Sequence, residues 1–175
     1  MNKQERKVIR QSAVNGTIVE LGSFVGTGSS LEFGKAIRKR ELKATLYCVD
    51  IFDDNYYAKY PDVMKRVRML HGQDRIIDIF ERNMRAYPHE TIVGDSADAA
   101  KGFPDGSVDL VFVDADHSYD GVQRDVSAWW PKVKFKGQML GHDYGRKEYG
   151  VTEAVHEIFG TVENPARSIW RVAKC

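Results

Sequence analysis

The feature of this sequence that most constrains its fold is a series of short apolar runs separated by longer stretches with helical periodicity. The runs are apolar on successive positions, which is typical of parallel strands covered on both faces. They lie at Thr17–Leu21, Thr45–Val49, Thr91–Val93, Val108–Val113, Gln138–Gly141 and Ser168–Val172. Helices are expected between them at Ser29–Lys39, Ile76–Arg85 (with Asp74 as its N-cap), Tyr119–Trp130 and Val151–Phe159. The alternation predicts βαβ units and an open α/β sheet with helices on both faces.

The size of the chain limits it to one core. It has 175 residues, of which 42% are hydrophobic and 29% charged, as in an ordinary globular domain. We therefore expect a single domain over residues 1–175. The connection over 52–75 is too long for an ordinary loop, and it carries Tyr56, Tyr57 and Tyr60. We interpret this segment as an insertion or a lid.

A glycine-rich loop follows the first predicted strand and opens the first predicted helix. It reads ELGSFVGTGSS and places glycines at 22, 26 and 28. Glycines allow the backbone to approach a ligand closely, and the free N–H groups at a helix start favour an anion. Leu31 stands where the third glycine of G-x-G-x-x-G would fall, and the G-K-S/T ending of a P-loop is absent. The spacing therefore argues against a dinucleotide site and against a P-loop.

Acidic residues mark the ends of the first four predicted strands. Glu20 and Asp50 end the first and second strands, Asp95 follows the third, and Asp114 and Asp116 follow the fourth. Ligands of open parallel sheets bind at the carboxyl ends of the strands, so these acids are expected to share one cleft. Converging carboxylates repel one another unless a cation or hydrogen-bond donors lie between them. A ligand with a positive charge, hydroxyl groups and an amine would supply both.

Four segments, taken in order, carry a family resemblance: ELGSFVGTGSS, YCVDIF, IVGDSAD and VDLVFVDADHSYDGVQRDVSAWWPKVKFKGQMLGHDY. They resemble class I S-adenosylmethionine-dependent methyltransferases, and among these the small bacterial and phage-type enzymes related to sugar, macrolide and catechol O-methyltransferases. The resemblance runs from about Thr17 to Tyr144. It implies a Rossmann-like, doubly wound sheet of about seven mostly parallel strands that ends in an antiparallel hairpin. It also implies S-adenosyl-L-methionine as cofactor and methyl transfer to a small-molecule acceptor, with oxygen as the expected acceptor atom.

The resemblance implies roles for residues at matching positions. The first loop would border the methionine part of the cofactor, and Asp50 would bind the ribose while Ile51 packs on the adenine. Asp95 and Ser96 would meet the adenine, and Asp114 would lie beside the methyl group. The implied cofactor-binding residues are Glu20, Gly22, Ser23, Phe24, Gly26, Ser29, Asp50, Ile51, Asp95, Ser96 and Asp114.

A divalent metal is a further expectation. In the catechol-type relatives, an acid after the fourth strand and an Asp-Asn pair after the fifth hold the metal, and Asp114 and Asp143 match these positions. Tyr144 stands at the asparagine position, which makes His142 the candidate third ligand. Oxygen ligands favour Mg²⁺, whereas a histidine ligand shifts the preference toward Mn, Fe or Zn. Such a metal would favour the deprotonated form of an acceptor hydroxyl.

His117 and Asp114 are the candidate catalytic residues. The ordinary pKa of histidine, near 6.5, suits His117 for general-base catalysis close to neutral pH. The alternative is that His117 only caps the helix that begins at Ser118–Tyr119. Asp98 and Asp120 lie near predicted helix starts, and we interpret them as structural.

Two other functions compete with a methyltransferase. A metal-dependent enzyme of another kind, such as a hydroxylase, could use the same frame, because a fold does not determine a reaction. A non-catalytic S-adenosylmethionine- or nucleoside-binding module is the second rival, since the chain holds little beyond a cofactor-binding half. A methyltransferase acting on adenine in nucleic acid is disfavoured, because Asp114-Ala115-Asp116-His117 replaces the proline-containing element of that class.

Charge and hydropathy bear on partners and location. The formal net charge is +1, from 26 basic and 25 acidic residues, which argues against a general nucleic-acid binder. No apolar run approaches the roughly 18 residues needed to span a bilayer, so we expect no membrane association. Two cysteines and a polar N-terminus are consistent with a cytoplasmic protein. A homo-oligomer is compatible with so small a domain.

Overall fold

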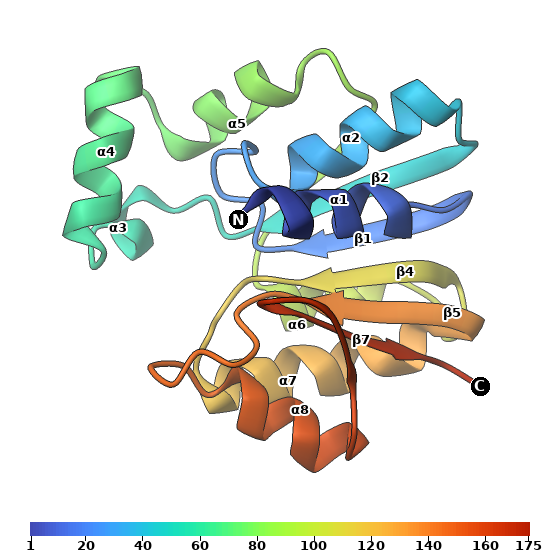
Figure 1. Ribbon diagram of the computed structural model, residues 1–175. Coiled ribbons are helices and arrows are strands. Elements are labelled where there is room, and N and C mark those ends of the chain that lie inside the picture. Colours follow the sequence, from blue (N-terminus) through green and yellow to red (C-terminus); the bar gives the residue numbers. More distant parts are fainter.

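One seven-stranded sheet organises the chain, and the computed structural model describes all residues, 1–175 (Figure 1). The spatial order is β3-β2-β1-β4-β5-β7-β6. Strands β1 to β5 run parallel, and β7 runs antiparallel to both β5 and β6. The bounds are β1 Gly16–Leu21, β2 Ala44–Asp50, β3 Glu90–Val93, β4 Val108–Val113, β5 Val133–Gly141, β6 Glu163–Ala166 and β7 Ile169–Ala173. The predicted doubly wound sheet and its final hairpin are confirmed.

Eight α-helices connect and cover these strands. They are α1 Lys3–Ser12, α2 Ser29–Arg40, α3 Asp54–Tyr57, α4 Pro61–His71, α5 Ile76–Met84, α6 Ser96–Ala99, α7 Tyr119–Trp129 and α8 Val151–Phe159, with 3₁₀ turns at Ala100–Gly102 and Trp130–Lys132. All four predicted helices are present. None of the helices has the length and apolar character that crossing a bilayer requires.

Two helical layers bury the two faces of the sheet. Helices α1, α2 and α5 cover one face, where Phe33 and Phe80 are fully buried. Helices α7 and α8 cover the other face around Trp129 and Trp170 (Figure 1). From Leu110 to Val113, successive residues of β4 belong alternately to the two clusters, as period-2 side-chain alternation requires. The continuous apolar runs in the sequence thus reflect a sheet that is covered on both sides.

The segment over 52–75 contains the short helix α3 and the longer α4, so it has secondary structure of its own. Both helices project beyond the sheet on the side of the glycine-rich loop (Figure 1). Its end differs from the prediction, because Arg75 and not Asp74 is the N-cap residue of α5 and makes no side-chain cap bond. The Asp74 carboxylate instead accepts a hydrogen bond from Arg82 at 2.8 Å. Asp74 therefore forms an ion pair with Arg82, further along α5, and does not cap the helix.

Helix α1 was not predicted, although its start carries a clear signal. The Asn2 side chain accepts from the N–H groups of Gln4 and Glu5, and the Glu5 carboxylate accepts from the Asn2 N–H at 2.6 Å. This reciprocal capping box stabilises the first turn. Ile9 then anchors the helix in the core. The consequence for the site is that α1 brings the buried Glu5 carboxylate close to the end of β5.

The contact between Gly141 and Trp170 gives a test of this packing. A Cβ atom on Gly141 would overlap the fully buried Trp170 indole. We expect Gly141→Ala to lower the free energy of unfolding by about 1–3 kcal/mol, because overpacking forces the ring or the strand to shift. Urea unfolding measures this. The matched control is Gly102→Ala, whose new methyl would meet open space. Equal stability of the two variants would contradict the packing described here.

Candidate functional site

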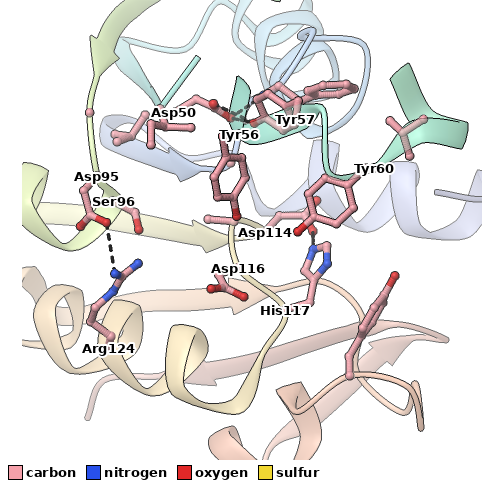
Figure 2. Close-up of a pocket in the computed structure, with 18 residues that line it drawn as sticks. Asp50, Tyr56, Tyr57, Tyr60, Asp95, Ser96, Asp114, Asp116, His117 and Arg124 are labelled. Carbon is pink, nitrogen blue, oxygen red and sulfur yellow. Dashed lines mark hydrogen bonds and ion pairs between the residues drawn. The ribbon is translucent and has the colours of Figure 1, made fainter. Parts of the chain in front are cut away.

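A concave site lies at the carboxyl ends of β1, β2, β3 and β4, where the strand order reverses. It has a volume of about 420 Å³ (Figure 2). The predicted site residues that line it are Gly22, Phe24, Asp50, Ile51, Asp95, Ser96, Asp114 and His117. The remaining lining residues are Val49, Tyr56, Tyr57, Tyr60, Val63, Gly94, Ala115, Asp116, Arg124 and Tyr149. The aspartates at the ends of β2, β3 and β4 therefore converge on one cleft as predicted, whereas Glu20 of β1 does not line it.

The predicted residues Glu20, Ser23 and Ser29 lie beneath the glycine-rich loop and do not line the cleft. Glu20 is fully buried, and its Oε2 accepts from Ser23 Oγ at 2.7 Å and Ser30 Oγ at 2.5 Å. Ser29 is buried as well, and its hydroxyl acts to lower the pKa of Glu20. Burial raises the pKa of Glu20, although the serine hydroxyls act to lower it. The Oε1 atom has no hydrogen-bond partner. This network supports the loop from below.

Gly22 brings the chain after β1 against the chain after β4. Its φ is +88°, and a Cβ atom there would overlap the carbonyl oxygen of Asp114. Only glycine permits this approach in a left-handed backbone conformation. Gly26 also has a positive φ, of 72°, but its missing Cβ accommodates Phe80 and Met84 of α5. Of these two predicted loop glycines, Gly22 shapes the cleft and Gly26 packs the loop on a helix.

Asp50 is held by two backbone N–H groups and the Tyr57 hydroxyl. Its Oδ1 accepts from the Phe52 N–H at 2.7 Å, and its Oδ2 accepts from the Phe24 N–H at 2.8 Å. The Tyr57 hydroxyl bonds to both oxygens, at 2.8 and 2.7 Å (Figure 2). Burial, then the adjacent Asp50 carboxylate, raises the pKa of Tyr57, so its hydroxyl is a donor throughout the ordinary pH range. The carboxylate is almost completely buried.

Helix α7 anchors the start of α6, where Asp95 is the N-cap residue and Ser96 the first helical residue. The Ser96 hydroxyl donates to the fully buried Asp125 at 2.5 Å, and Trp129 Nε1 donates to the Ser96 carbonyl at 2.7 Å. Arg124 pairs with Asp95 at 3.2 Å (Figure 2). Burial raises the pKa of Asp125 to about 6. Arg124 and Asp125 were not predicted as site residues, because their contacts cross from a helix to a distant strand end.

A cluster of acids and histidines closes the other end of the cleft. His117 Nε2 is buried, lies 3.4 Å from Asp114 Oδ1 and 3.2 Å from Asp143 Oδ2, and has no aligned hydrogen bond. The ligand atoms of Asp114, His117 and Asp143 lie within 4.8 Å of one another. Asp143 reaches the cluster from a left-handed backbone conformation, with φ of 59°. These three residues form the set best placed to hold a cation.

The charges in this cluster shift one another's pKa values. Burial lowers the pKa of His117, but the carboxylates of Asp114 and Asp143 outweigh it and raise the pKa overall. Burial raises the pKa of Asp114, even though both histidines oppose it. Burial also acts to raise the pKa of Asp143, but here His142 and His117 prevail and lower it. The imidazole of His117 is therefore held between two carboxylates that favour its protonated form.

His142, the predicted third metal ligand, has a different environment from His117. Its Nδ1 lies 3.2 Å from Asp143 Oδ1, and its Nε2 lies 3.7 Å from Glu5 Oε2 of α1. Carboxylates thus flank both of its ring nitrogens. Tyr144, at the asparagine position of the relatives, points to His156, with a 2.8 Å contact between its hydroxyl and Nε2. His142 Nδ1 also lies 3.7 Å from Asp114 Oδ1, so both histidines contact both aspartates, while the ligand atoms that lie within 4.8 Å of one another are those of Asp114, His117 and Asp143.

The alternative structural role of His117 is not observed. Ser118 is the N-cap of α7, and its hydroxyl accepts from the Gly121 N–H at 3.1 Å. His117 precedes the cap and packs on Tyr149, with ring centroids 4.8 Å apart. Asp98 and Asp120 lie in the first turns of α6 and α7, as predicted. The geometry leaves His117 free to act in the cleft.

Comparison with known proteins identifies the family. A model described as "Methyltransferase domain" matches residues 19–144. The protein y4gI of Sinorhizobium fredii, called uncharacterized, is 30% identical over 135 residues. That match covers 76% of this chain but only 14% of the relative, so the chain corresponds to a small part of a much longer protein.

Solved structures share the fold at low sequence identity. The O-methyltransferase NovP superposes with a TM-score of 0.70 at 18% identity, over 98% of this chain and 79% of NovP. A methyltransferase from Geobacter sulfurreducens gives 0.64 at 13% identity, over 99% and 79%. CalS11, a TDP-rhamnose 3'-O-methyltransferase, gives 0.61 at 14% identity, over 97% and 76%. With the matched range spanning the glycine-rich loop and all the acidic strand ends, the chain belongs to the methyltransferase-domain family.

Proposed function

We propose that the chain is an S-adenosylmethionine-dependent methyltransferase that acts on a hydroxyl oxygen of a small molecule. The observation that carries the proposal is that one cleft gathers a glycine-rich loop, the carboxylates at three strand ends and a histidine held by two aspartates. The family match supports the donor. NovP and CalS11, two O-methyltransferases with this fold, support oxygen as the acceptor atom.

The donor would lie along the strand ends, from β3 to β4. Asp50 would accept hydrogen bonds from the ribose hydroxyls, as acids at the end of the second strand do in related folds. Ile51, which is 40% exposed, offers an apolar face for the adenine, and Asp95 and Ser96 border the same region. Beside Gly22, Asp114 would place negative charge near the positive sulfonium. Glu20, Ser23, Gly26 and Ser29 would then act indirectly, by shaping the loop.

The acceptor would enter beside His117. Tyr56, Tyr60 and Tyr149 line this part of the cleft with Asp116, so the walls combine aromatic faces with polar groups (Figure 2). Aromatic faces and carboxylates suit a hydroxyl-bearing molecule better than an anionic one. The enzyme's main contribution would be alignment of the acceptor oxygen, the methyl carbon and the sulfur.

His117 is the group that we assign to the acceptor's proton. Its Nε2 faces Asp114 and Asp143, which leaves Nδ1 as the nitrogen available to accept a proton. The two carboxylates would stabilise the imidazolium that results. In the transfer, the bond from sulfur to the methyl carbon breaks, the bond from oxygen to that carbon forms, and the hydroxyl proton passes to His117.

The same trio fits a divalent cation. Two carboxylates and the unpartnered, buried Nε2 of His117 form a donor set of the kind that binds Mg²⁺, Mn²⁺ or Zn²⁺. Such an ion would supply Lewis acidity toward the acceptor oxygen. A cation on Nε2 would leave the ring proton on Nδ1 and remove His117 as a base. The two roles of His117 therefore exclude each other and can be separated by experiment.

Cofactor binding is tested at Asp50. We expect Asp50→Ala to weaken binding of S-adenosylhomocysteine by about 1–3 kcal/mol, because hydrogen bonds to a charged acceptor are lost. Isothermal titration calorimetry gives the affinity. Asp105→Ala, which removes an exposed acid paired with Lys132, is the control and should bind as the wild type does. Unchanged affinity in Asp50→Ala would remove this residue from the cofactor site.

Proton transfer is tested by the pH dependence of methyl transfer, after an acceptor has been found by screening hydroxyl compounds. Activity requires neutral His117, so it should rise with pH and level off above the usual pKa of histidine. Asp143→Asn should move that rise to lower pH, because this carboxylate raises the pKa of His117. A rise that stays in place in Asp143→Asn would argue against His117 as the base.

Metal dependence is tested on the same assay with a chelator. If His117 is the base, activity survives EDTA in the wild type and is lost in His117→Gln. Loss of wild-type activity in EDTA, with recovery on adding Mg²⁺ or Mn²⁺, would assign the trio to a cation instead. Binding of S-adenosylhomocysteine without turnover of any acceptor would support a non-catalytic module. Product formation that needs oxygen and iron would support a hydroxylase.

A further inference from the structure

Three donors within the chain already bind Asp50. An ionised carboxylate offers about four acceptor positions. Two are taken by the N–H groups of Phe52 and Phe24, and the Tyr57 hydroxyl lies within 2.8 Å of both oxygens on the remaining side, so that its single proton is shared between them. The backbone donors belong to the turns that form the cleft. Tyr57 is therefore the partner of Asp50 that a ligand would have to replace.

Tyr57 belongs to the segment over 52–75 and reaches Asp50 from the cleft side. It lines the cleft together with Asp50, and its ring lies against Phe24 with centroids 4.6 Å apart (Figure 2). Tyr56 packs edge-on against it at 5.4 Å. The Tyr57 hydroxyl gives Asp50 a hydrogen bond of the kind that a ribose hydroxyl would give. Its place in the cleft is the place that the proposed function assigns to the ribose.

We infer that Tyr57 is a built-in competitor of the cofactor: its hydroxyl bonds to Asp50 at the position proposed for the ribose and must leave when S-adenosylmethionine binds. The inference rests on the proposed function, because it takes Asp50 as the ribose acceptor. It goes further in assigning Tyr57 a role opposite to that of a cofactor-binding residue. Tyr57 lowers the affinity for the donor and for its product.

The local structure permits Tyr57 to leave while the rest of the segment stays anchored. Helix α3 is only four residues long and none of its residues is fully buried. By contrast, α4 is fixed in the core by Met64 and Val67. Arg68 of α4 pairs with Asp54 at 2.9 Å, which holds the start of α3. Rotation of the Tyr57 side chain, or loss of the last turn of α3, is enough to free Asp50.

The competition has a consequence for turnover. A buried carboxylate that loses one of its donors is destabilised, so a site that lacked Tyr57 would hold more tightly any ribose that bonded to Asp50. The Tyr57 hydroxyl supplies a replacement hydrogen bond as the product departs. The exchange keeps Asp50 paired in both states and favours release of S-adenosylhomocysteine, which would otherwise occupy the site.

The test compares Tyr57→Phe with the wild-type chain by calorimetry with S-adenosylhomocysteine. The variant keeps the ring that packs on Phe24 and removes only the hydroxyl. We expect about tenfold tighter binding, since a hydrogen bond to a charged group no longer has to be broken first. Equal or weaker binding by Tyr57→Phe overturns the inference. If the wild type does not bind S-adenosylhomocysteine at all, the proposed function fails instead.

A matched control and a second measurement complete the design. Tyr119→Phe removes a hydroxyl that donates to the Glu157 carboxylate outside the cleft, so its affinity should change less than twofold; tightening equal to that of Tyr57→Phe overturns the inference. In wild-type protein labelled at the tyrosine Cζ carbon, the Tyr57 resonance should lose the shift of a carboxylate-bonded phenol when S-adenosylhomocysteine saturates the site. A resonance that stays in place also overturns the inference. Tyr57→Leu assigns the resonance should Tyr57→Phe not fold.

Discussion

The close approach of Gly22 to the chain that leaves β4 is the constraint on which the site depends. The Gly22 N–H donates to the Val49 carbonyl at 2.8 Å, and the Asp114 N–H donates to the Leu21 carbonyl at 2.9 Å. These bonds tie the ends of three parallel strands together at the point where the strand order reverses. A Cβ at position 22 would force them apart. Asp50 and Asp114 share one cleft because Gly22, which lies between the two strand ends, has no side chain.

The second principle of the site is compensation of clustered negative charge. Asp50 is balanced by backbone N–H groups and by Tyr57, Asp95 by Arg124, and the pair of Asp114 and Asp143 by His117. Each acid is balanced by a different chemical group. The Tyr57 hydroxyl and the proton on His117 are the groups that a ligand could replace. A ribose would replace a phenol, and a divalent cation would replace the proton on an imidazole. The carboxylates of the cleft are thus paired with groups of the chain itself, and a bound ligand would take the place of some of these groups.

Much of this could be predicted from local sequence patterns. Strand ends and the glycine at position 22 are local features, so the sheet, the cleft and the acids at 50, 95 and 114 were predictable. Contacts between distant segments were not. The Glu5 carboxylate beside His142, Arg124 on Asp95 and Tyr149 on His117 depend on how helices and loops dock. Likewise, the sequence alone is compatible with His117 as a helix cap, and the structure shows that Ser118 caps α7 instead.

The measurement that tests the central claim most directly is a crystal structure of the chain with S-adenosylhomocysteine. We expect adenosine in the cleft between Ile51 and Ser96, with the ribose hydroxyls on Asp50 and the sulfur beside Asp114. We also expect that the Tyr57 hydroxyl no longer bonds to the Asp50 carboxylate. A ligand bound elsewhere, or a ribose turned away from Asp50 with the Tyr57 contact intact, would contradict both the assignment of the site and the role of Tyr57.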